Sequence, residues 1–144
     1  MNKGNKVIFF HPNQESEKGL FLAQEGISAG FPSPADDFKE IRISLDKELV
    51  KNQESTFYAR VSGDSMLGAG IDDGDLLVID KSLSPENGKI AVCFIDGDFT
   101  VKRIVKEKGK LYLKAENKKY KSIELSGESE LIIWGIVEYV IKKI

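Results

Sequence analysis

The sequence predicts a mainly β protein, built as strongly bent antiparallel sheets or a partial barrel, with an extended N-terminal arm. Six or more short apolar or alternating runs follow one another between residues 56 and 141, with turn residues between them and little room for helices. The first 37 residues carry three of the four prolines and show no sustained strand or helix period. We therefore expect one β-rich domain that follows an arm.

Three segments are expected along the 144 residues, a length that suits one domain of common size. Residues 1–29 form the arm, residues 30–37 a flexible linker, and residues 38–144 the β-rich domain. The stretch 25–34 is rich in glycine, serine and proline. Such a composition is typical of segments that are open to proteases.

The apolar runs assign the elements of the domain in order. Residues 46–50 predict a helical turn that Ser44 or Asp46 caps. Asp96 and Gly97 separate two β-rich runs, and Asp-Gly is a strong signal for a tight hairpin, so these runs should be antiparallel neighbours. Strands are expected at 41–45, 56–61, 75–80, 89–95, 98–105, 111–113, 122–125 and 131–141.

Composition excludes several classes of function. Twenty-one Lys and Arg against 23 Asp and Glu give a net charge of −2, which makes direct sequence-specific DNA binding unexpected. No phosphate-binding glycine motif is present in the sequence, so no nucleotide cofactor is expected. The longest apolar stretch, at 131–141, contains Glu138 and is too short to cross a bilayer. We expect a cytoplasmic protein without a membrane segment or a cofactor.

Cysteine and histidine are too few for a metal site or a disulfide. Cys93 and His11 are the only residues of their types, so neither an internal disulfide nor a zinc site is expected. The acidic run at 72–75 is wrongly spaced for a calcium loop and is expected to be a solvated turn that enters a strand. Cys93 lies in the middle of an apolar run and should be an inert core residue.

Ser62–Met66, with the sequence Ser-Gly-Asp-Ser-Met, directly follows the run that ends at Val61. A serine at a strand-to-turn junction can direct its hydroxyl into a cleft. The backbone N–H groups of Ser65 and Met66 can then point at a developing oxyanion. The alternative is structural, with Ser62 or Asp64 as a helix cap and Ser65 as an ordinary turn residue.

A serine nucleophile needs a base, and His11 lies in the arm, before any core strand. Lysine and carboxylate side chains are the remaining candidates. Strand alternation places Lys102 on one face with Thr100 and Ile104. Burial on that face would disfavour the ammonium form and leave an amine that can accept the serine proton. The alternative is a solvated lysine on an exposed strand face.

Together these motifs resemble the LexA and UmuD family of self-cleaving Ser–Lys peptidases. Lys102 lies 37 residues after Ser65, within the motif Phe-Thr-Val-Lys-Arg. The upstream stretch 29–36 closely resembles the cleavage region of UmuD-type members, which are accessory subunits of error-prone DNA polymerase V. Residues 70–77 and 134–137 add supporting matches in the same order. The similarity extends from about residue 26 to the end of the chain.

The resemblance implies a fold of the LexA and signal-peptidase type and a self-cleavage reaction in the SOS response to DNA damage. Ser65 would be the nucleophile, Lys102 the general base, and the bond between Ala29 and Gly30 the cleavage site. The shorter product would serve translesion synthesis and mutagenesis. Implied partners are a second copy in a homodimer, the RecA–single-stranded DNA filament that stimulates cleavage, and a UmuC-like catalytic subunit of the Y family.

Three other interpretations remain to be weighed. A LexA repressor needs an N-terminal DNA-binding domain, and the 29 residues before Gly30 carry no helix-turn-helix pattern, so a repressor is not expected. A signal-peptidase-like Ser–Lys protease would need a membrane anchor and an apolar insertion surface. A non-catalytic polymerase-binding module with a residual dyad is the alternative from a different class.

Overall fold

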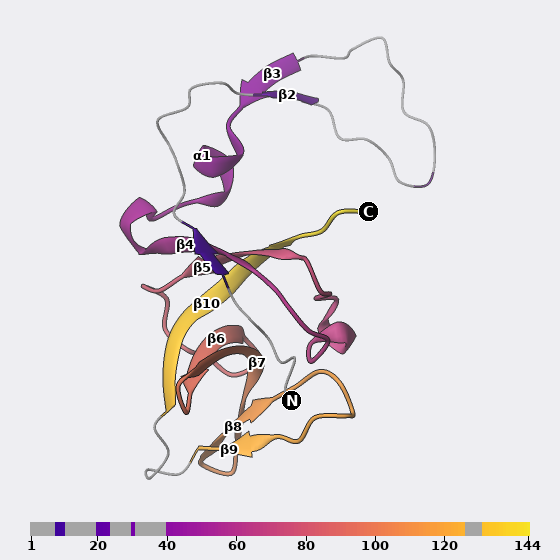
Figure 1. The fold of residues 1–144 in the computed structure, drawn as a ribbon. Helices are drawn as coiled ribbons and strands as arrows, with labels where there is room; N and C mark the ends of the chain where they lie inside the picture. Colours follow the sequence, from indigo (N-terminus) through magenta and orange to yellow (C-terminus); the bar gives the residue numbers. More distant parts are fainter. Residues whose placement is uncertain (1–7, 11–19, 24–29, 31–39, 126–130) are drawn as a thin grey trace. The chain divides into compact units, whose positions relative to one another are not determined.

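A computed structural model describes residues 8–10, 20–23, 30, 40–125 and 131–144 (Figure 1). The chain forms two compact units, one made of residues 1–12 and 52–144 and the other of residues 13–51. The protein is mainly β, as the sequence predicts. Within the described ranges, no helix is long and apolar enough to span a membrane.

The larger unit is built on one eight-stranded sheet in which all neighbouring strands are antiparallel (Figure 1). The predicted hairpin at Asp96 and Gly97 joins β6 (Ile90–Ile95) and β7 (Asp98–Glu107), which confirms that pairing. The strand order across the sheet is β1 (Ile8–Phe10), β4 (Thr56–Arg60), β5 (Leu76–Asp80), β10 (Leu131–Ile141), β6 (Ile90–Ile95), β7 (Asp98–Glu107), β8 (Lys110–Lys114) and β9 (Ile123–Glu124).

The smaller unit contains the antiparallel pair β2 (Leu20–Ala23) and β3 (Glu40–Ile43), followed by α1 (Leu45–Leu49). The helical turn is therefore present, with Ser44 at its N-cap position but without the predicted side-chain cap hydrogen bond. Leu45 begins the helix and does not extend the strand. No strand is expected in the arm from the sequence, whereas β1 and β2 lie there. Strands of three and four residues are too short to show a period. The segment boundaries at residues 29 and 37 stay a prediction.

Strands β6 and β7 separate two apolar clusters of the larger unit. Val92 and Val101 belong to the first cluster, while Ala91, Cys93 and Ile104 belong to the second. Successive side chains of a strand point to opposite faces, so both faces of these central strands meet a core. This double burial explains the continuous apolar run of β6, and Cys93 is fully buried as predicted.

Strand β10 is long and visibly curved (Figure 1). Its register shifts between Ile133 and Gly135 against β6, and between Val137 and Tyr139 against β5. Such irregularities bend a strand and increase its twist. A Cβ atom at Gly135 would lie 2.6 Å from Cγ2 of Ile79, so the close approach of β10 to β5 requires glycine at this position.

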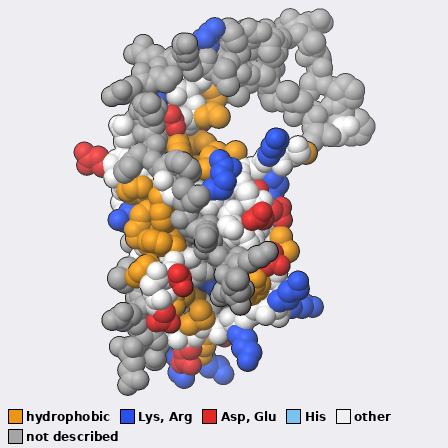
Figure 2. Space-filling view, in the orientation of Figure 1, with side chains coloured by type: hydrophobic (Ala, Val, Ile, Leu, Met, Phe, Trp, Pro, Cys, Tyr) orange, Lys and Arg blue, Asp and Glu red, His pale blue; other side chains and the backbone are white. Residues whose placement is uncertain are grey.

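Side chains of both charge signs lie among apolar ones on the face shown in Figure 2. This mixture agrees with the near balance of 21 basic and 23 acidic residues in the chain. A surface of mixed charge creates no strong electrostatic potential of one sign. Individual charged groups therefore affect their surroundings mainly where they are buried or form direct contacts.

Gly135→Ala should lower the free energy of unfolding by about 1–3 kcal/mol, because the added methyl group overlaps Ile79. Urea denaturation of single and double variants measures this cost. In an Ile79→Ala background, where the opposing methyl group is gone, the cost of Gly135→Ala should shrink by at least about 0.5 kcal/mol. Equal costs in the two backgrounds would show that the overlap does not constrain β10.

Candidate active site

The turn that carries Ser65 begins where β4 ends. The N–H of Val61 donates to the carbonyl oxygen of Asp75 at 2.8 Å, and the N–H of Gly74 donates to that of Val61 at 2.8 Å. These two bonds close the connection between β4 and β5 at its base. Gly63 has a φ of 105°, a conformation that glycine adopts without strain, and it reverses the chain just before Ser65.

Ser65 itself is held in place by its neighbour. Met66 is 2% exposed and packs in the first apolar cluster, and its carbonyl oxygen accepts from the N–H groups of Ala69 and Ile71. The short helix η2 (Leu67–Ala69) follows at once, with Met66, and not Ser62 or Asp64, at its N-cap position. The Ser65 side chain is only 2% exposed, which distinguishes it from an ordinary solvated turn serine.

Lys102 lies on β7 opposite Ala91 of β6 and is only 5% exposed. Its Nζ donates to Oγ1 of Thr100 at 3.0 Å, which confirms that the two side chains share a face. The alternative of a solvated lysine on an exposed strand face is therefore wrong. Both faces of β7 pack against a core, so this lysine stands among apolar neighbours, with Ile104 next to it on the same face.

Burial lowers the pKa of Lys102 below its ordinary value of 10.5, because the buried site disfavours the ammonium form. Cys93 acts in the opposite direction when it is ionised, and this is the smaller influence. Burial also raises the pKa of Cys93 to about 12, so this thiol is neutral near pH 7. The site therefore favours a neutral amine on Lys102 at a lower pH than an exposed lysine would show.

The side chain of Tyr120 connects the Ser65 turn with Lys102. Its hydroxyl donates to Oδ1 of Asp64, the residue before Ser65, at 2.6 Å. Its ring centroid lies 5.7 Å from Nζ of Lys102, within the range of a cation–π contact. One tyrosine thus contacts both Lys102 and the residue that immediately precedes Ser65.

Sequence reasoning missed Tyr120 and the loop in which it lies. The Lys-rich stretch 116–121 resembles a solvated turn in composition, and no motif in it signals a role. Asn117 nevertheless donates through Nδ2 to the backbone oxygen of Asp64 at 2.8 Å, although the two residues are 53 positions apart. Only the fold shows that this loop borders the Ser65 turn.

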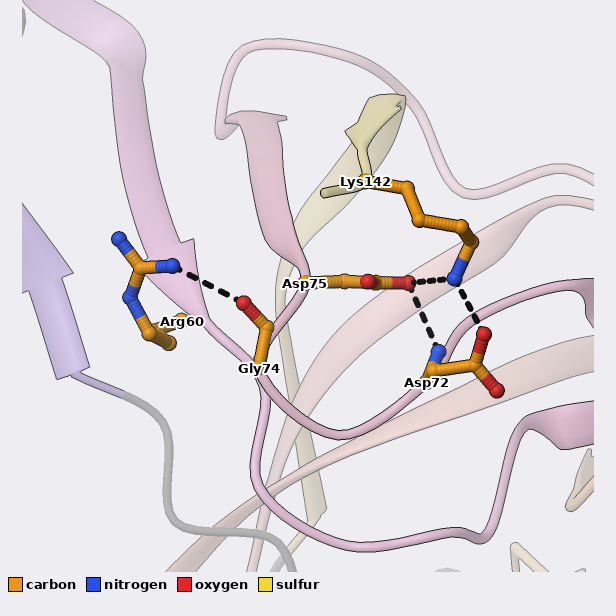
Figure 3. A network of polar contacts seen from close by, with 5 residues as sticks. All are labelled: Arg60, Asp72, Gly74, Asp75 and Lys142. Atoms are coloured by element: carbon orange, nitrogen blue, oxygen red, sulfur yellow. Dashed lines mark hydrogen bonds and ion pairs between the residues drawn. The ribbon is translucent and has the colours of Figure 1, made fainter. Parts of the chain in front are cut away.

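The acidic run at 72–75 is more than the solvated turn that the sequence predicts. Asp75 is 4% exposed, and its Oδ2 accepts from the N–H of Asp72 at 2.8 Å (Figure 3). Lys142, beyond the end of β10, forms ion pairs with Asp72 and Asp75. Figure 3 also shows Arg60 donating to the carbonyl oxygen of Gly74 at 2.9 Å. These ion pairs join the turn to the residue that follows β10. They also give the buried carboxylate of Asp75 the partners that a buried charge needs.

The predicted cleavage site is only partly within the described residues. Gly30 is exposed and belongs to the unit formed by residues 13–51. Ala29 and His11 lie outside the described residues. The roles of Ala29 and Gly30 as cleavage site, of Ser65 and Lys102 as dyad, and of the Ser65 and Met66 N–H groups as oxyanion donors stay predictions.

Comparisons with known proteins agree with these motifs. A family model described as Peptidase S24-like matches residues 20–138. The chain is 38% identical over 138 residues to protein SamA of Salmonella typhimurium, covering 95% of this chain and 96% of SamA. It is 36% identical over 123 residues to protein ImpA of Salmonella typhimurium, covering 85% and 83%. It is 33% identical over 142 residues to the LexA repressor of Aliivibrio salmonicida, covering 98% and 68%.

Proposed function

Because this chain belongs to the Peptidase S24-like family, we propose that it cleaves its own backbone between Ala29 and Gly30 by means of Ser65 and Lys102. The observation that carries the proposal is the burial of Lys102 at 5% exposure, with a lowered pKa, on a strand between two apolar clusters. A neutral amine is the form that a serine nucleophile needs from a lysine base.

In the first half of the reaction, Ser65 Oγ bonds to the carbonyl carbon of Ala29 while its proton moves to Nζ of Lys102. The resulting oxyanion would lie near the N–H groups of Ser65 and Met66. The bond from Ala29 to the Gly30 nitrogen then breaks, and Lys102 returns the proton to that nitrogen. Ala29 is left as an ester on Ser65, and a new amino terminus begins at Gly30.

In the second half, water attacks the ester and gives its proton to Lys102. The ester bond breaks, Ser65 recovers its hydroxyl proton from Lys102, and Ala29 leaves as a free carboxylic acid, which ionises at neutral pH. Thr100 supports Lys102 in both halves, since its Oγ1 accepts a hydrogen bond from Nζ at 3.0 Å and so orients the amine.

The proposed biological role is that of an SOS mutagenesis protein. Its similarity to SamA and ImpA supports a UmuD-like product, residues 30–144, that serves as accessory subunit of a Y-family translesion polymerase. The RecA–single-stranded DNA filament would favour the arm conformation that brings Ala29 to Ser65 and would add no catalytic side chain. We further propose that the protein acts as a homodimer in the cytoplasm.

Purified protein incubated at mildly alkaline pH should lose residues 1–29, because self-cleavage needs no other enzyme. Intact-mass spectrometry measures the loss. Ser65→Ala should stay intact, since it lacks the nucleophile, and Gly30→Val should cleave at least about tenfold more slowly because a β-branched side chain keeps the backbone away from the nucleophile. Conversion of Ser65→Ala at the wild-type rate, or an unchanged mass for every form, would contradict the proposal.

The cleavage rate should rise with pH and level off, because only the neutral amine of Lys102 accepts the serine proton. The midpoint should lie below 10.5, the ordinary pKa of lysine, since burial disfavours the ammonium. Lys102→Arg should be inactive at every accessible pH because a guanidinium keeps its proton. Lys121→Arg, at an exposed position, is the matched control and should cleave like the wild type. Cleavage by Lys102→Arg with the wild-type pH profile would show that another group is the base.

A further inference from the structure

Among the described residues, the loop at residues 116–120 contacts the Ser65 turn at four points. The N–H of Gly68 donates to the backbone oxygen of Glu116 at 2.7 Å. Nδ2 of Asn117 donates to the backbone oxygen of Asp64 at 2.8 Å, and the hydroxyl of Tyr120 donates to Oδ1 of Asp64 at 2.6 Å. Nζ of Lys119 also lies 3.9 Å from Oδ2 of Asp64, so three of the four contacts converge on the residue that precedes Ser65.

The 116–120 loop is itself held in one conformation. The Glu116 carboxylate pairs with the guanidinium of Arg103 on β7, next to Lys102. Inside the loop, the N–H of Tyr120 donates to the backbone oxygen of Asn117 at 3.1 Å. Its approach to the Ser65 turn is close, because a Cβ atom at Gly68 would lie 2.7 Å from the oxygen of Glu116. Because the loop is bound to β7, its contacts can hold the Ser65 turn in one position relative to that strand.

We propose that Asn117 and Tyr120 are positioning residues for the self-cleavage reaction, holding the peptide group between Asp64 and Ser65 and laying an aromatic face beside the Lys102 amine. This inference rests on the proposed function, and it assigns a role to side chains that neither the motif nor the family resemblance singles out.

On the nucleophile side, the planarity of the peptide bond matters. The oxygen of Asp64 and the N–H of Ser65 belong to one planar group and point in opposite directions. The oxygen of Asp64 accepts from Nδ2 of Asn117 at 2.8 Å and from the N–H of Leu67 at 3.4 Å, so Asn117 adds the shorter of the two bonds that orient the Ser65 N–H. Tyr120 binds the side chain of Asp64. An N–H that is oriented before the reaction stabilises an oxyanion without the cost of reorganisation.

On the base side, the ring of Tyr120 faces the Lys102 amine at 5.7 Å. An aromatic face favours the ammonium form, whereas burial among the apolar side chains of the strand favours the amine. Among the described residues, the Thr100 hydroxyl and the Cys93 thiol of β6 also face Lys102. The Asp64 carboxylate lies at the hydroxyl end of the ring, with the Lys119 ammonium 3.9 Å from its Oδ2. The ring thus sets the pH at which the base becomes neutral.

The first test compares two tyrosine-to-phenylalanine variants in the full chain. Tyr120→Phe keeps the ring beside Lys102 and removes the hydroxyl that binds Asp64. The plateau rate of cleavage should fall about tenfold, with the midpoint of the pH profile unchanged. Tyr112→Phe, on β8 opposite Val105, removes the same atom elsewhere in the fold and should cleave at the wild-type rate.

Asn117→Ala should lower the plateau rate by a similar factor. Combined with Tyr120→Phe, it should lower the rate by less than the product of the two single effects, because both residues hold Asp64. Tyr120 is 37% exposed, so its truncation leaves no core cavity, and thermal unfolding of each variant checks that the fold is retained. A fully multiplicative effect would mean that the two residues do not act through one group.

The second test addresses the base through Tyr120→Leu, which removes the ring as well as the hydroxyl. The midpoint of its pH profile should move to lower pH than that of Tyr120→Phe, since the contact that favours the ammonium is lost. A readout that needs no cleavage is the side-chain titration of Lys102 by nuclear magnetic resonance in a Ser65→Ala background. The Lys102 titration midpoint should again be lower in Tyr120→Leu than in Tyr120→Phe.

The outcomes separate this inference from the function on which it rests. Cleavage that persists in Ser65→Ala would overturn the proposed function. Cleavage that requires Ser65 and Lys102 but proceeds equally fast in Tyr120→Phe and Tyr112→Phe would overturn the positioning role and leave the dyad intact. Equal Lys102 titration midpoints in Tyr120→Leu and Tyr120→Phe would overturn the role of the ring, whether or not the chain cleaves itself.

Discussion

The burial of Lys102 is the constraint on which the account of this protein depends. A lysine in an apolar interior costs free energy in its charged form, so the fold must either neutralise it or provide partners. Here Nζ has the Thr100 hydroxyl as acceptor and the face of Tyr120 beside it, and no carboxylate pairs with it among the described residues. Such surroundings favour a proton acceptor over a structural ion pair.

The position of β7 accounts for this burial. β6 pairs with it at Lys102, β8 pairs with it from Arg103 onward, and apolar clusters cover the two faces of the strand, which leaves Lys102 only 5% exposed. The same strand carries Arg103, which binds Glu116 and so fastens the loop that reaches the Ser65 turn. One strand therefore supplies the candidate base and also anchors the loop that contacts the candidate nucleophile's neighbour.

The sequence predicted the fold where patterns are local. The Asp-Gly turn at Asp96 and the alternation around Lys102 predicted the β6–β7 pair and the face that Lys102 occupies. It could not predict that a second apolar cluster covers that face, because this depends on strands far away in the chain. The contact of Tyr120 with Asp64 spans 56 residues, and that of Lys142 with Asp75 spans 67, so no local pattern reveals either one.

The most direct test of the central claim compares two titrations of the same protein. One is the titration of the Lys102 side chain by nuclear magnetic resonance in Ser65→Ala, which should stay intact. The other is the pH dependence of self-cleavage in the wild type. The titration of Lys102 and the cleavage rate should share one midpoint, below the ordinary lysine pKa of 10.5. A Lys102 that remains an ammonium at a pH where cleavage has already reached its plateau would contradict the central claim.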